Sequence, residues 1–383
     1  MKIALVIERM DVTRGGRETS TAQIALALAA AGHKVAILCQ QGQLDSKGVE
    51  VRPLGAFGWS RATRARNFIL AVQEVIIRER FDIVHSMLPV PGANVYQLRG
   101  GTVPGQARAG LRRRTPLGRL LAKYTRFCNR HRSIMGQMES LVMADPHTHL
   151  LAVSEMVAAE VREHYGRTQN LHVVYNAVEI SEADAEQRAD WRQQLRFLLG
   201  MGSGDLLLLV VANNFELKGV AETIDALAQW HRQYPSLRIR LAVVGRDPAE
   251  AEGYVRLAGL RSVGPLVHIL APSRDIFRWY CAADICVLLS WYDPCSRVVL
   301  EATRWGLPSI TTSFNGAAEV LAAGGIVVSS PAATEEVVSA LDTMSEEDNL
   351  REMSRQCLQI APKLSMARHV DELLNVYKGI LAK

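Results

Sequence analysis

The chain has 383 residues and a formal net charge of +5, with 48% hydrophobic and 22% charged residues. This length predicts two or three domains, and the composition is that of a folded globular protein and excludes a largely disordered one. The six cysteines form no Cys-x-x-Cys pair and no metal-binding spacing with histidine, so free thiols in a reducing compartment are expected.

The amino-terminal half alternates predicted strands and helices. The apolar run 3–7 is typical of a buried parallel strand, and Gly32 ends a helix over 19–31 that precedes a strand over 34–39. Further helices are predicted over 67–80, up to 143, and over 155–165, with strands over 82–85, 94–98, 149–153 and 171–175. The first run is too short for a signal peptide, and no run of 18 apolar residues occurs, so a cytoplasmic protein is expected.

The second half continues the same alternation after a polar helical region over 179–199. The pattern predicts strands over 206–211, 238–244, 267–270, 285–289, 309–312 and 325–328, and helices over 220–234, 249–260 and 366–381. Strands that alternate with helices in both halves predict an α/β protein with two parallel sheets and right-handed crossovers. The boundary falls near 176–179, which gives domains 1–176 and 177–365.

Two carboxylates eight positions apart, Asp293 and Glu301, flank a turn of small residues and the predicted start of a helix. In such a turn the backbone N–H groups of Ser296, Arg297 and Val298 can point at an anion, with help from the helix dipole. Glu301 can then accept hydrogen bonds from ribose hydroxyls, and Asp293 can face the hydroxyls of a sugar, which makes Asp293 a candidate for a catalytic role. The pattern favours a site for a nucleotide-linked sugar over the alternative of a surface aspartate and an acid near a helix N-terminus.

The segment 293–302, followed by Gly306-Leu307-Pro308, resembles the acidic donor-site motif of the GT-B glycosyltransferases of family 4, which are retaining sugar transferases. The usual form is Glu-x7-Glu, whereas this chain has Asp293-x7-Glu301, with Cys295-Ser296 where Phe-Gly is common. Other segments that resemble the family are Gly15-Gly16, 151–155, 176–178, 208–220, 243–245 and 282–285. The resemblance covers nearly the whole chain, and within the family the chain is similar, more narrowly, to the lipopolysaccharide-core glucosyltransferases.

This resemblance implies a GT-B fold, in which two Rossmann-like domains have parallel sheets that face an interdomain cleft. The acceptor would bind to 1–176 and the donor to 177–365, and the helix at 366–383 would pack back onto the first domain. It also implies a retaining enzyme that uses a nucleoside-diphosphate sugar, UDP-hexose, as co-substrate, with no cofactor and no metal; no Asp-x-Asp motif occurs. A glycan or lipid-linked acceptor in cell-envelope glycoconjugate synthesis follows from the same resemblance.

Lys218 lies in the segment that resembles the family's donor-diphosphate loop, so it is expected to bind the diphosphate; the alternative is a solvated surface lysine. The family usually places an arginine five residues earlier, where this chain has Asn213, which can donate hydrogen bonds but carries no charge. Gly245 and Arg246, which follow a predicted strand, are expected on the donor side as well.

Gly15 and Gly16 lie between the first strand and the first helix. The G-x-G-x-x-G fingerprint of a dinucleotide site is absent, and no ribose-binding acid follows the second strand. The two glycines are therefore expected to let the backbone approach the donor phosphates or the acceptor.

Two residues of the first half are candidates for a catalytic role. His85 lies at the carboxyl end of a predicted strand, where ligands bind in open α/β sheets, and it is either structural or catalytic. Arg99 lies in the stretch where many family members carry a His or Asp near the reacting sugar, and it is a candidate electrostatic replacement.

Between Arg108 and Arg132 the chain has nine basic residues and no acidic one. Leu117, Leu120, Leu121 and Tyr124 follow helical spacing, so a basic amphipathic helix is predicted, which would bind the enzyme peripherally to an anionic membrane at the inner face of the cytoplasmic membrane. A solvated or internally paired face is the alternative. Nucleic acid is not expected as a partner of a sugar transferase.

Two other functions remain open at this point. A nucleotide-sugar epimerase can have the same fold, because a fold does not determine a function. A non-catalytic scaffold that only binds a partner is the second, since Asp293, Asn213 and the 97–101 stretch depart from the family pattern.

Overall fold

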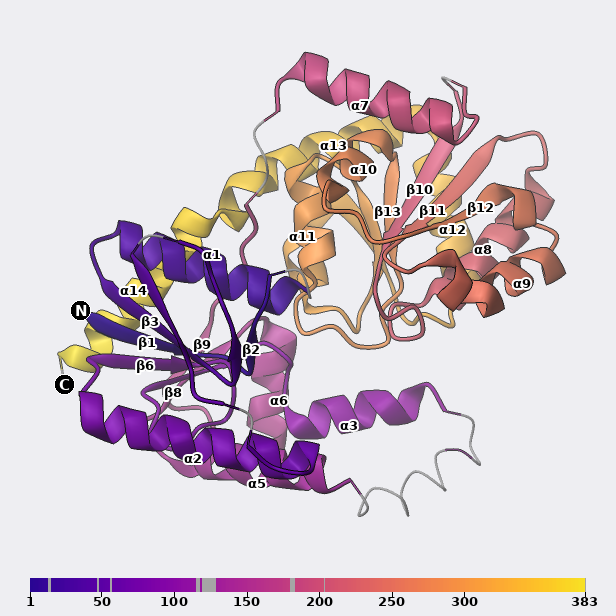
Figure 1. Cartoon of the computed structure of the whole chain (residues 1–383). Coiled ribbons are helices and arrows are strands. Elements are labelled where there is room, and N and C mark those ends of the chain that lie inside the picture. The colour runs from indigo at the N-terminus through magenta and orange to yellow at the C-terminus, as the bar shows by residue number, and fades with distance from the viewer. Residues whose placement is uncertain are drawn as a thin grey trace. The chain divides into compact units, whose positions relative to one another are not determined.

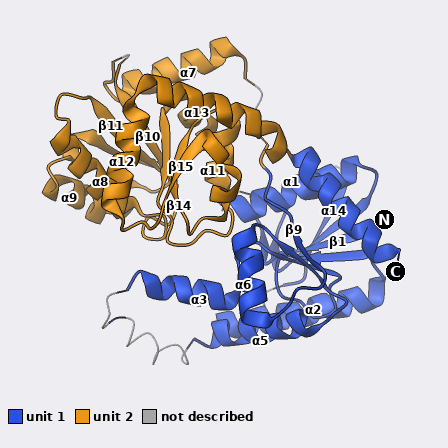
Figure 2. Ribbon diagram, turned by 180° about the vertical axis from the view of Figure 1, so that it is seen from behind, with its two compact units in different colours: residues 1–177, 366–383 blue, residues 178–365 orange. Residues whose placement is uncertain are grey.

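The computed structural model describes residues 1–12, 15–46, 48–55, 57–114, 118, 129–179, 183–202 and 204–382. The chain divides into two compact units (Figure 2). Unit 1 consists of Met1–Ala177 and Met366–Lys383, and unit 2 consists of Val178–Ser365. Each unit is built around its own parallel sheet (Figure 1).

The sheet of unit 1 has seven strands in the order β5-β3-β1-β6-β7-β8-β9, all paired in parallel. The strands are β1 (Lys2–Val6), β3 (Lys34–Cys39), β5 (Val49–Pro53), β6 (Ile83–Ser86), β7 (Val95–Leu98), β8 (His149–Ala152) and β9 (Leu171–Val173). A separate two-stranded pair is formed by β2 (Arg9–Met10) and β4 (Gln41–Gly42). The helices are α1 (Gly16–Ala30), α2 (Arg61–Glu79), α3 (Val103–Arg112), α5 (Arg130–Ala144), α6 (Glu155–Tyr165) and α14 (Met366–Leu381).

The first strand shows how this unit is layered. Successive side chains of a strand point to opposite faces of the sheet. Ile3 and Leu5 pack in one core cluster with residues of α1 and α14, whereas Ala4 and Val6 pack in another cluster with residues of α2. The apolar run predicted as a buried strand is therefore apolar because helices cover both faces of the sheet. The carboxyl-terminal helix α14 contributes Leu373 and Tyr377 to this core, both without exposure.

Unit 1 differs from the sequence prediction in several places, including the start of α2 and the presence of β5 and α3. Helix α2 begins at Arg61 rather than at 67, because Ser60 and Thr63 form a capping box that starts it earlier. Strand β5 was not predicted, since this edge strand alternates apolar and charged residues. Helix α3 was also not predicted; it begins after the cap Thr102, whose side chain accepts from a backbone N–H of the first turn.

The sheet of unit 2 has six parallel strands in the order β12-β11-β10-β13-β14-β15. They are β10 (Leu206–Val211), β11 (Ile239–Val244), β12 (Val267–Leu270), β13 (Ile285–Leu288), β14 (Ser309–Thr312) and β15 (Gly325–Val328). The helices are α7 (Ala185–Leu198), α8 (Val220–Gln233), α9 (Glu252–Leu260), α10 (Ile276–Ala282), α11 (Arg297–Arg304), α12 (Thr334–Ser345) and α13 (Glu347–Ile360). The helix predicted over 249–260 is a 3₁₀ turn, Pro248–Ala251, followed by α9, and α10, α12 and α13 were not predicted.

The strand order of unit 2 creates a switch point between β10 and β13. From β10 the chain proceeds to β11 and β12 on one side of the sheet, and β13 then pairs with β10 on its other side. The connections that leave the carboxyl ends of β10 and β13 therefore diverge, and ligands of open α/β sheets bind in the crevice that this leaves. Lys218 and Asp293 lie on the loops that follow these two strands.

Candidate functional site

The loop that follows β10 packs directly against the end of β13. Gly219 has a left-handed φ of 70°, and a Cβ placed on it would lie 2.1 Å from the carbonyl oxygen of Leu289. The N–H of Trp291 also donates to the carbonyl of Leu217 over 3.0 Å. Glycine at 219 thus permits the close approach that places Lys218 beside the loop after β13.

Lys218 and Asp293 form an ion pair between the Nζ of the lysine and an Oδ of the aspartate. Their side chains are only 18% and 12% exposed. The backbone of Asp293 is held by the carbonyl of Phe314 and by the N–H of Gly316, each over 2.9 Å. The structure therefore brings together the lysine predicted to bind the diphosphate and the acid predicted to face the sugar, and an incoming anion must compete with Asp293 for the ammonium.

Glu301 is held by two donors, one on each carboxylate oxygen. The hydroxyl of Tyr280 donates to Oε2 over 2.9 Å, and Nη2 of Arg297 donates to Oε1 over 3.2 Å. Burial, followed by the charge of Glu301, raises the pKa of Tyr280 well above its usual value, so the phenol stays protonated and donates. Two donors leave a carboxylate with further lone pairs, so Glu301 is fixed in direction and can still accept hydrogen bonds. The sequence prediction missed Tyr280, because no local pattern marks it.

The prediction for the backbone of Ser296 needs a correction. Its N–H donates to Oδ1 of Asn315 over 3.2 Å and is therefore committed to the fold rather than to an anion. Asn315 is 1% exposed, and its Nδ2 donates in turn to Oγ1 of Thr311 over 2.9 Å. The loop after β14 thereby fixes the start of α11. Arg297 and Val298 are the first two residues of that helix.

The other candidates of unit 2 lie at the same edge of its sheet. Asn213 is exposed in the loop just after β10. Gly245 follows β11 with a φ of 135°, and a Cβ on it would lie 2.2 Å from the carbonyl oxygen of Ala212. The guanidinium of Arg246 lies 5.8 Å from the ring centre of Phe215, which belongs to the Lys218 loop. These residues therefore gather around the carboxyl ends of β10 and β11.

The two glycines of unit 1 adopt conformations that do not require glycine. Gly15 is extended, with a φ of 163°, and Gly16 is the first residue of α1. The close approach of a ligand to these two glycines stays a prediction.

Arg99 is 8% exposed and joins β7 to α1. Its Nε donates to Oε1 of Gln97 over 2.9 Å, and its Nη1 donates to Oγ1 of Thr21 over 3.0 Å and to the carbonyl of Arg17 over 3.1 Å. These hydrogen bonds connect the end of β7 to the first turns of α1 at the carboxyl edge of the unit 1 sheet.

His85 lies inside the core of unit 1, with no exposed surface. Its Nδ1 lies 2.6 Å from the hydroxyl of Tyr377 on α14. Burial, with a smaller contribution from the charge of Arg99, lowers the pKa of His85 to about 3, so the imidazole is neutral. A buried group of this kind does not contact a substrate, and we propose no catalytic role for it.

The basic segment predicted as a membrane-binding helix falls largely outside the described residues, which omit 115–117 and 119–128. Within the described part, Arg108 of α3 forms an ion pair of 2.5 Å with Glu163 of α6, and both side chains are about half exposed. One of the nine cations is thus neutralised internally. No helix in the described ranges combines the length and apolar character needed to cross a bilayer.

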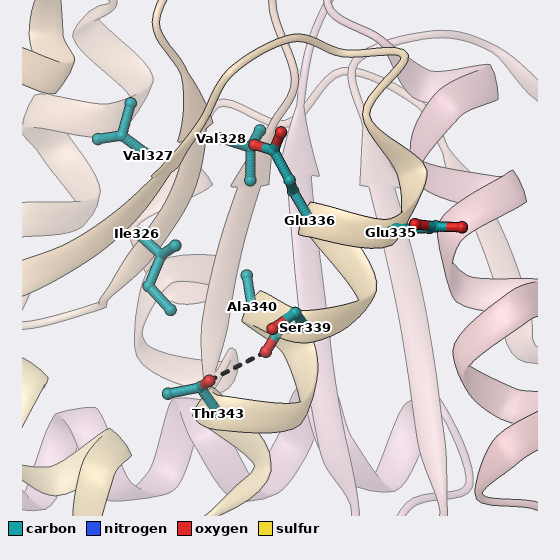
Figure 3. A pocket seen from close by; sticks show the side chains of 8 residues that line it. All are labelled: Ile326, Val327, Val328, Glu335, Glu336, Ser339, Ala340 and Thr343. Carbon is teal, nitrogen blue, oxygen red and sulfur yellow. Dashed lines mark hydrogen bonds between the residues drawn. The ribbon is translucent and has the colours of Figure 1, made fainter.

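Unit 2 also has a hollow of about 440 Å³ between β15 and α12 (Figure 3). Its charged lining residues are the acids Glu335 and Glu336, beside the apolar side chains of β15. Two carboxylates disfavour a diphosphate, so this hollow is not a candidate donor site. Among the described residues, no three His, Cys, Asp or Glu side chains are grouped so that they can hold a metal ion.

Comparison with known proteins points to one class of enzyme. Residues 14–182 match a family model described as Glycosyltransferase Family 4, and residues 205–347 match one described as Glycosyl transferases group 1. The chain is 26% identical over 344 residues to the lipopolysaccharide glucosyltransferase WaaG of Escherichia coli (strain K12), covering 88% of each protein. It is also 26% identical over 261 residues to D-inositol 3-phosphate glycosyltransferase 1 of Catenulispora acidiphila, covering 65% of this chain and 60% of that protein.

Solved structures show the same fold. The crystal structure of WaaG aligns with a TM-score of 0.81 at 22% identity, over 98% of this chain and all of that one. Anabaena Alr3699/HepE in complex with UDP-glucose aligns with a TM-score of 0.74 at 17% identity, over 99% of this chain and 100% of that one.

Proposed function

The chain is a glycosyltransferase of the GT-B fold that resembles lipopolysaccharide glucosyltransferases, and on that basis we propose that it transfers a hexose from a UDP-sugar, with retention, to a glycan or lipid-linked acceptor of the cell envelope. The observation that carries the proposal is the ion pair of Lys218 and Asp293 beyond the carboxyl ends of β10 and β13, with Glu301 on helix α11, which follows Asp293. This edge is where a doubly wound sheet binds nucleotides. The UDP and UDP-glucose complexes of HepE support the same class of donor.

In the proposed complex the diphosphate takes the Lys218 ammonium as its counter-charge. Lys218 is the cation that the structure holds at the switch point, and Asp293 keeps it in place until the donor arrives. Arg246 adds a second positive charge near the same loop. The N–H groups at the start of α11 and the helix dipole favour negative charge there as well.

Glu301 is proposed to bind the ribose. Tyr280 and Arg297 hold its carboxylate in one orientation before a ligand binds. A vicinal diol can donate to the remaining lone pairs, and hydrogen bonds to a charged acceptor contribute about 1.5–3 kcal/mol. Asp293, once the lysine turns to the phosphate, is free to accept hydrogen bonds from the sugar.

The proposed chemistry uses electrostatic stabilisation of the leaving group. The bond from the anomeric carbon to the diphosphate oxygen breaks, the acceptor oxygen bonds to the same face of that carbon, and the acceptor proton moves to the departing diphosphate. Preorganised positive charge at the leaving oxygen lowers the barrier without a covalent enzyme intermediate. The proposal includes no metal and no cofactor.

The donor assignment is tested by thermal unfolding of the full chain in the presence of a panel of nucleotide sugars. A donor that binds the folded state raises the melting temperature by mass action. We expect UDP and UDP-hexoses to raise it in the wild-type chain and not in a Lys218→Ala variant. Transfer of labelled sugar to a lipid or glycan acceptor then separates a transferase from an epimerase, which releases an isomerised free nucleotide sugar, and from a scaffold, which binds UDP without turnover.

We also propose that the acceptor is reached at an anionic membrane surface through the segment 108–132. Each cation near such a surface contributes about 1 kcal/mol. Sedimentation with liposomes of increasing anionic-lipid content tests this, since reversal of Arg112, Arg113 and Arg114 to Glu is expected to abolish binding. If liposome binding does not depend on the anionic-lipid content, or is unchanged in the triple variant, the segment has no role in binding to an anionic membrane.

A further inference from the structure

Unit 2 has a second hollow, at the edge of its sheet opposite the candidate donor site. Its volume is about 430 Å³, and its lining comes from α7, α10, α13 and the turn between α11 and β14. Asp284 directly precedes β13 and Pro308 directly precedes β14, whereas Lys218 and Asp293 lie beyond the carboxyl ends of strands. A volume of this size suits a small metabolite.

The lining of this pocket carries a net positive charge. It contains Arg188, Arg192 and Arg351, and Asp284 is its one acidic residue. Asp284 is paired with Arg192 over 2.5 Å and with Arg196 over 2.9 Å, so two cations share one carboxylate, and Nη1 of Arg192 also donates to the backbone carbonyl of Ala282 over 2.8 Å. Arg351 pairs with an acid of its own helix. The excess charge makes the pocket suitable for an anion.

Arg188 is held in place without a carboxylate partner. Its guanidinium lies over the ring of Trp305, 4.7 Å from the ring centre, and its Nε donates to the carbonyl of Ala183 over 3.0 Å. Among the described residues, no carboxylate lies within ion-pair distance of Arg188. A cation–π contact orients the planar fork without neutralising its charge. Such a fork matches the spacing of phosphate oxygens and can bind two of them.

Two structural elements connect this pocket to Glu301. Helix α11 begins at the donor-site turn after Ser296 and ends at Arg304, directly before Trp305, and its eight residues span about 12 Å. Tyr280 lines the pocket, and its hydroxyl donates to Glu301 over 2.9 Å. A ligand that shifts Tyr280 or the end of α11 therefore changes the group proposed to hold the ribose.

We propose that this pocket binds a small phosphate-bearing anion through Arg188, and that its occupancy changes the affinity of unit 2 for the nucleotide through Tyr280 and Glu301. The binding step stands on the pocket alone. The coupling step rests on the proposed function, because it takes Glu301 as a donor-binding residue. Linkage makes the effect reciprocal, so the nucleotide changes the affinity for the anion by the same factor.

The binding step is tested by calorimetric titration of inorganic pyrophosphate into the full chain, with saturating UDP present to occupy the donor site. Saturable binding is expected in the wild type, at least tenfold weaker binding in Arg188→Gln, and unchanged binding in the control Arg256→Gln. Arg256 is an exposed arginine of α9 that does not line the pocket. Binding that does not saturate, or that is equal in all three proteins, overturns the proposal.

The coupling step is tested by measuring UDP affinity with and without pyrophosphate. Pyrophosphate that competes directly with UDP at the donor site does so in Arg188→Gln as well. The coupling is therefore the difference between the wild type and this variant in the shift of UDP affinity that pyrophosphate causes. We expect this shift to differ severalfold between the wild type and Arg188→Gln. The Tyr280→Phe variant is expected to bind pyrophosphate as the wild type does but to lose this difference. Equal shifts in wild type and Arg188→Gln overturn the coupling. If UDP binds to a Lys218→Ala variant as well as to the wild type, the proposed function fails. The pyrophosphate titration, repeated in that variant without UDP, still decides whether the pocket binds pyrophosphate.

Discussion

Opposite substitutions in the Lys218–Asp293 pair are expected to change UDP affinity in opposite directions. Lys218→Met removes the cation proposed to bind the diphosphate. Asp293→Asn keeps the size of the side chain but removes the charge that competes with the diphosphate for Lys218. We therefore expect weaker UDP binding in the first variant and tighter binding in the second, whereas sugar transfer falls in both.

The size of the effect follows from the burial of the pair. A hydrogen bond to a charged group contributes about 1.5–3 kcal/mol, so Lys218→Met is expected to weaken UDP binding about 10- to 150-fold. Asp293→Asn is expected to strengthen UDP binding, because the negative charge that competes for Lys218 is lost. The gain is expected to be only about tenfold, because the amide oxygen still accepts one hydrogen bond from the ammonium. Breaking a fully buried pair costs about 3–5 kcal/mol of stability; here the side chains keep 18% and 12% exposure, so the cost is expected to be smaller.

The assay is calorimetric titration of UDP, after urea unfolding has shown that each variant is folded. Arg256→Met serves as a control, because that side chain is 70% exposed and pairs with Glu252 on its own helix. The reasoning would be refuted if Asp293→Asn weakened UDP binding as much as Lys218→Met, since the aspartate would then assist the nucleotide rather than compete with it.

Three further predictions follow from single sites. Glu301→Ala is expected to reduce UDP affinity by about 1.5–3 kcal/mol, and unchanged affinity in a folded variant would exclude Glu301 from the donor site. Gly219→Ala is expected to lower the free energy of unfolding by more than about 2 kcal/mol, because the cost of a left-handed backbone conformation, about 1–2 kcal/mol, adds to a backbone clash at 2.1 Å. The control Gly200→Ala has a φ of 64° and no atom within 4 Å of the new Cβ, so it has only the cost of the left-handed conformation. Equal losses of stability in the two variants would contradict the clash. Burial lowers the pKa of His85 and His369 to about 3, so the unfolded chain binds protons below pH 6.5 that the folded chain does not. The contribution of the two histidines to the free energy of unfolding is therefore fully present above pH 6.5, and it decreases by about 1.4 kcal/mol per pH unit for each histidine as the pH drops towards 3. Urea unfolding of the wild type and of His369→Asn at pH 7 and pH 5 measures this decrease. It should be smaller in the variant, and an equal decrease would be inconsistent with this cause.

Local sequence patterns predicted most of the central strands and many of the helices around them. The run 206–211 was predicted as a strand and is β10, and 155–165 was predicted as a helix and is α6, with the same bounds. Strands covered on both faces are continuous apolar runs, and capped helices have recognisable ends, so each signal lies within about ten residues of sequence. Where the signal is weaker, as in the edge strand β5 with its alternating charges, the prediction missed the element.

The candidate residues were accessible to sequence reasoning, but their partners were not. Resemblance and spacing identified Lys218, Asp293 and Glu301 separately. The ion pair between the first two joins residues 75 positions apart, and Tyr280 reaches Glu301 across 21 positions. No periodicity encodes such a contact, because it depends on which loops the sheet order brings to the same edge.

The sequence by itself determined the α/β class, the alternation of elements and the identity of the acidic motif, because each depends on side-chain chemistry at short range. Only the tertiary structure decided that the N–H of Ser296 is used by Asn315, and that His85 lies in a core closed by Tyr377, which is 292 residues away. The physical reason is that burial and hydrogen-bond pairing depend on long-range packing: a backbone N–H or an imidazole has the same covalent chemistry at the surface and in the core, and its neighbours alone determine what it can bind.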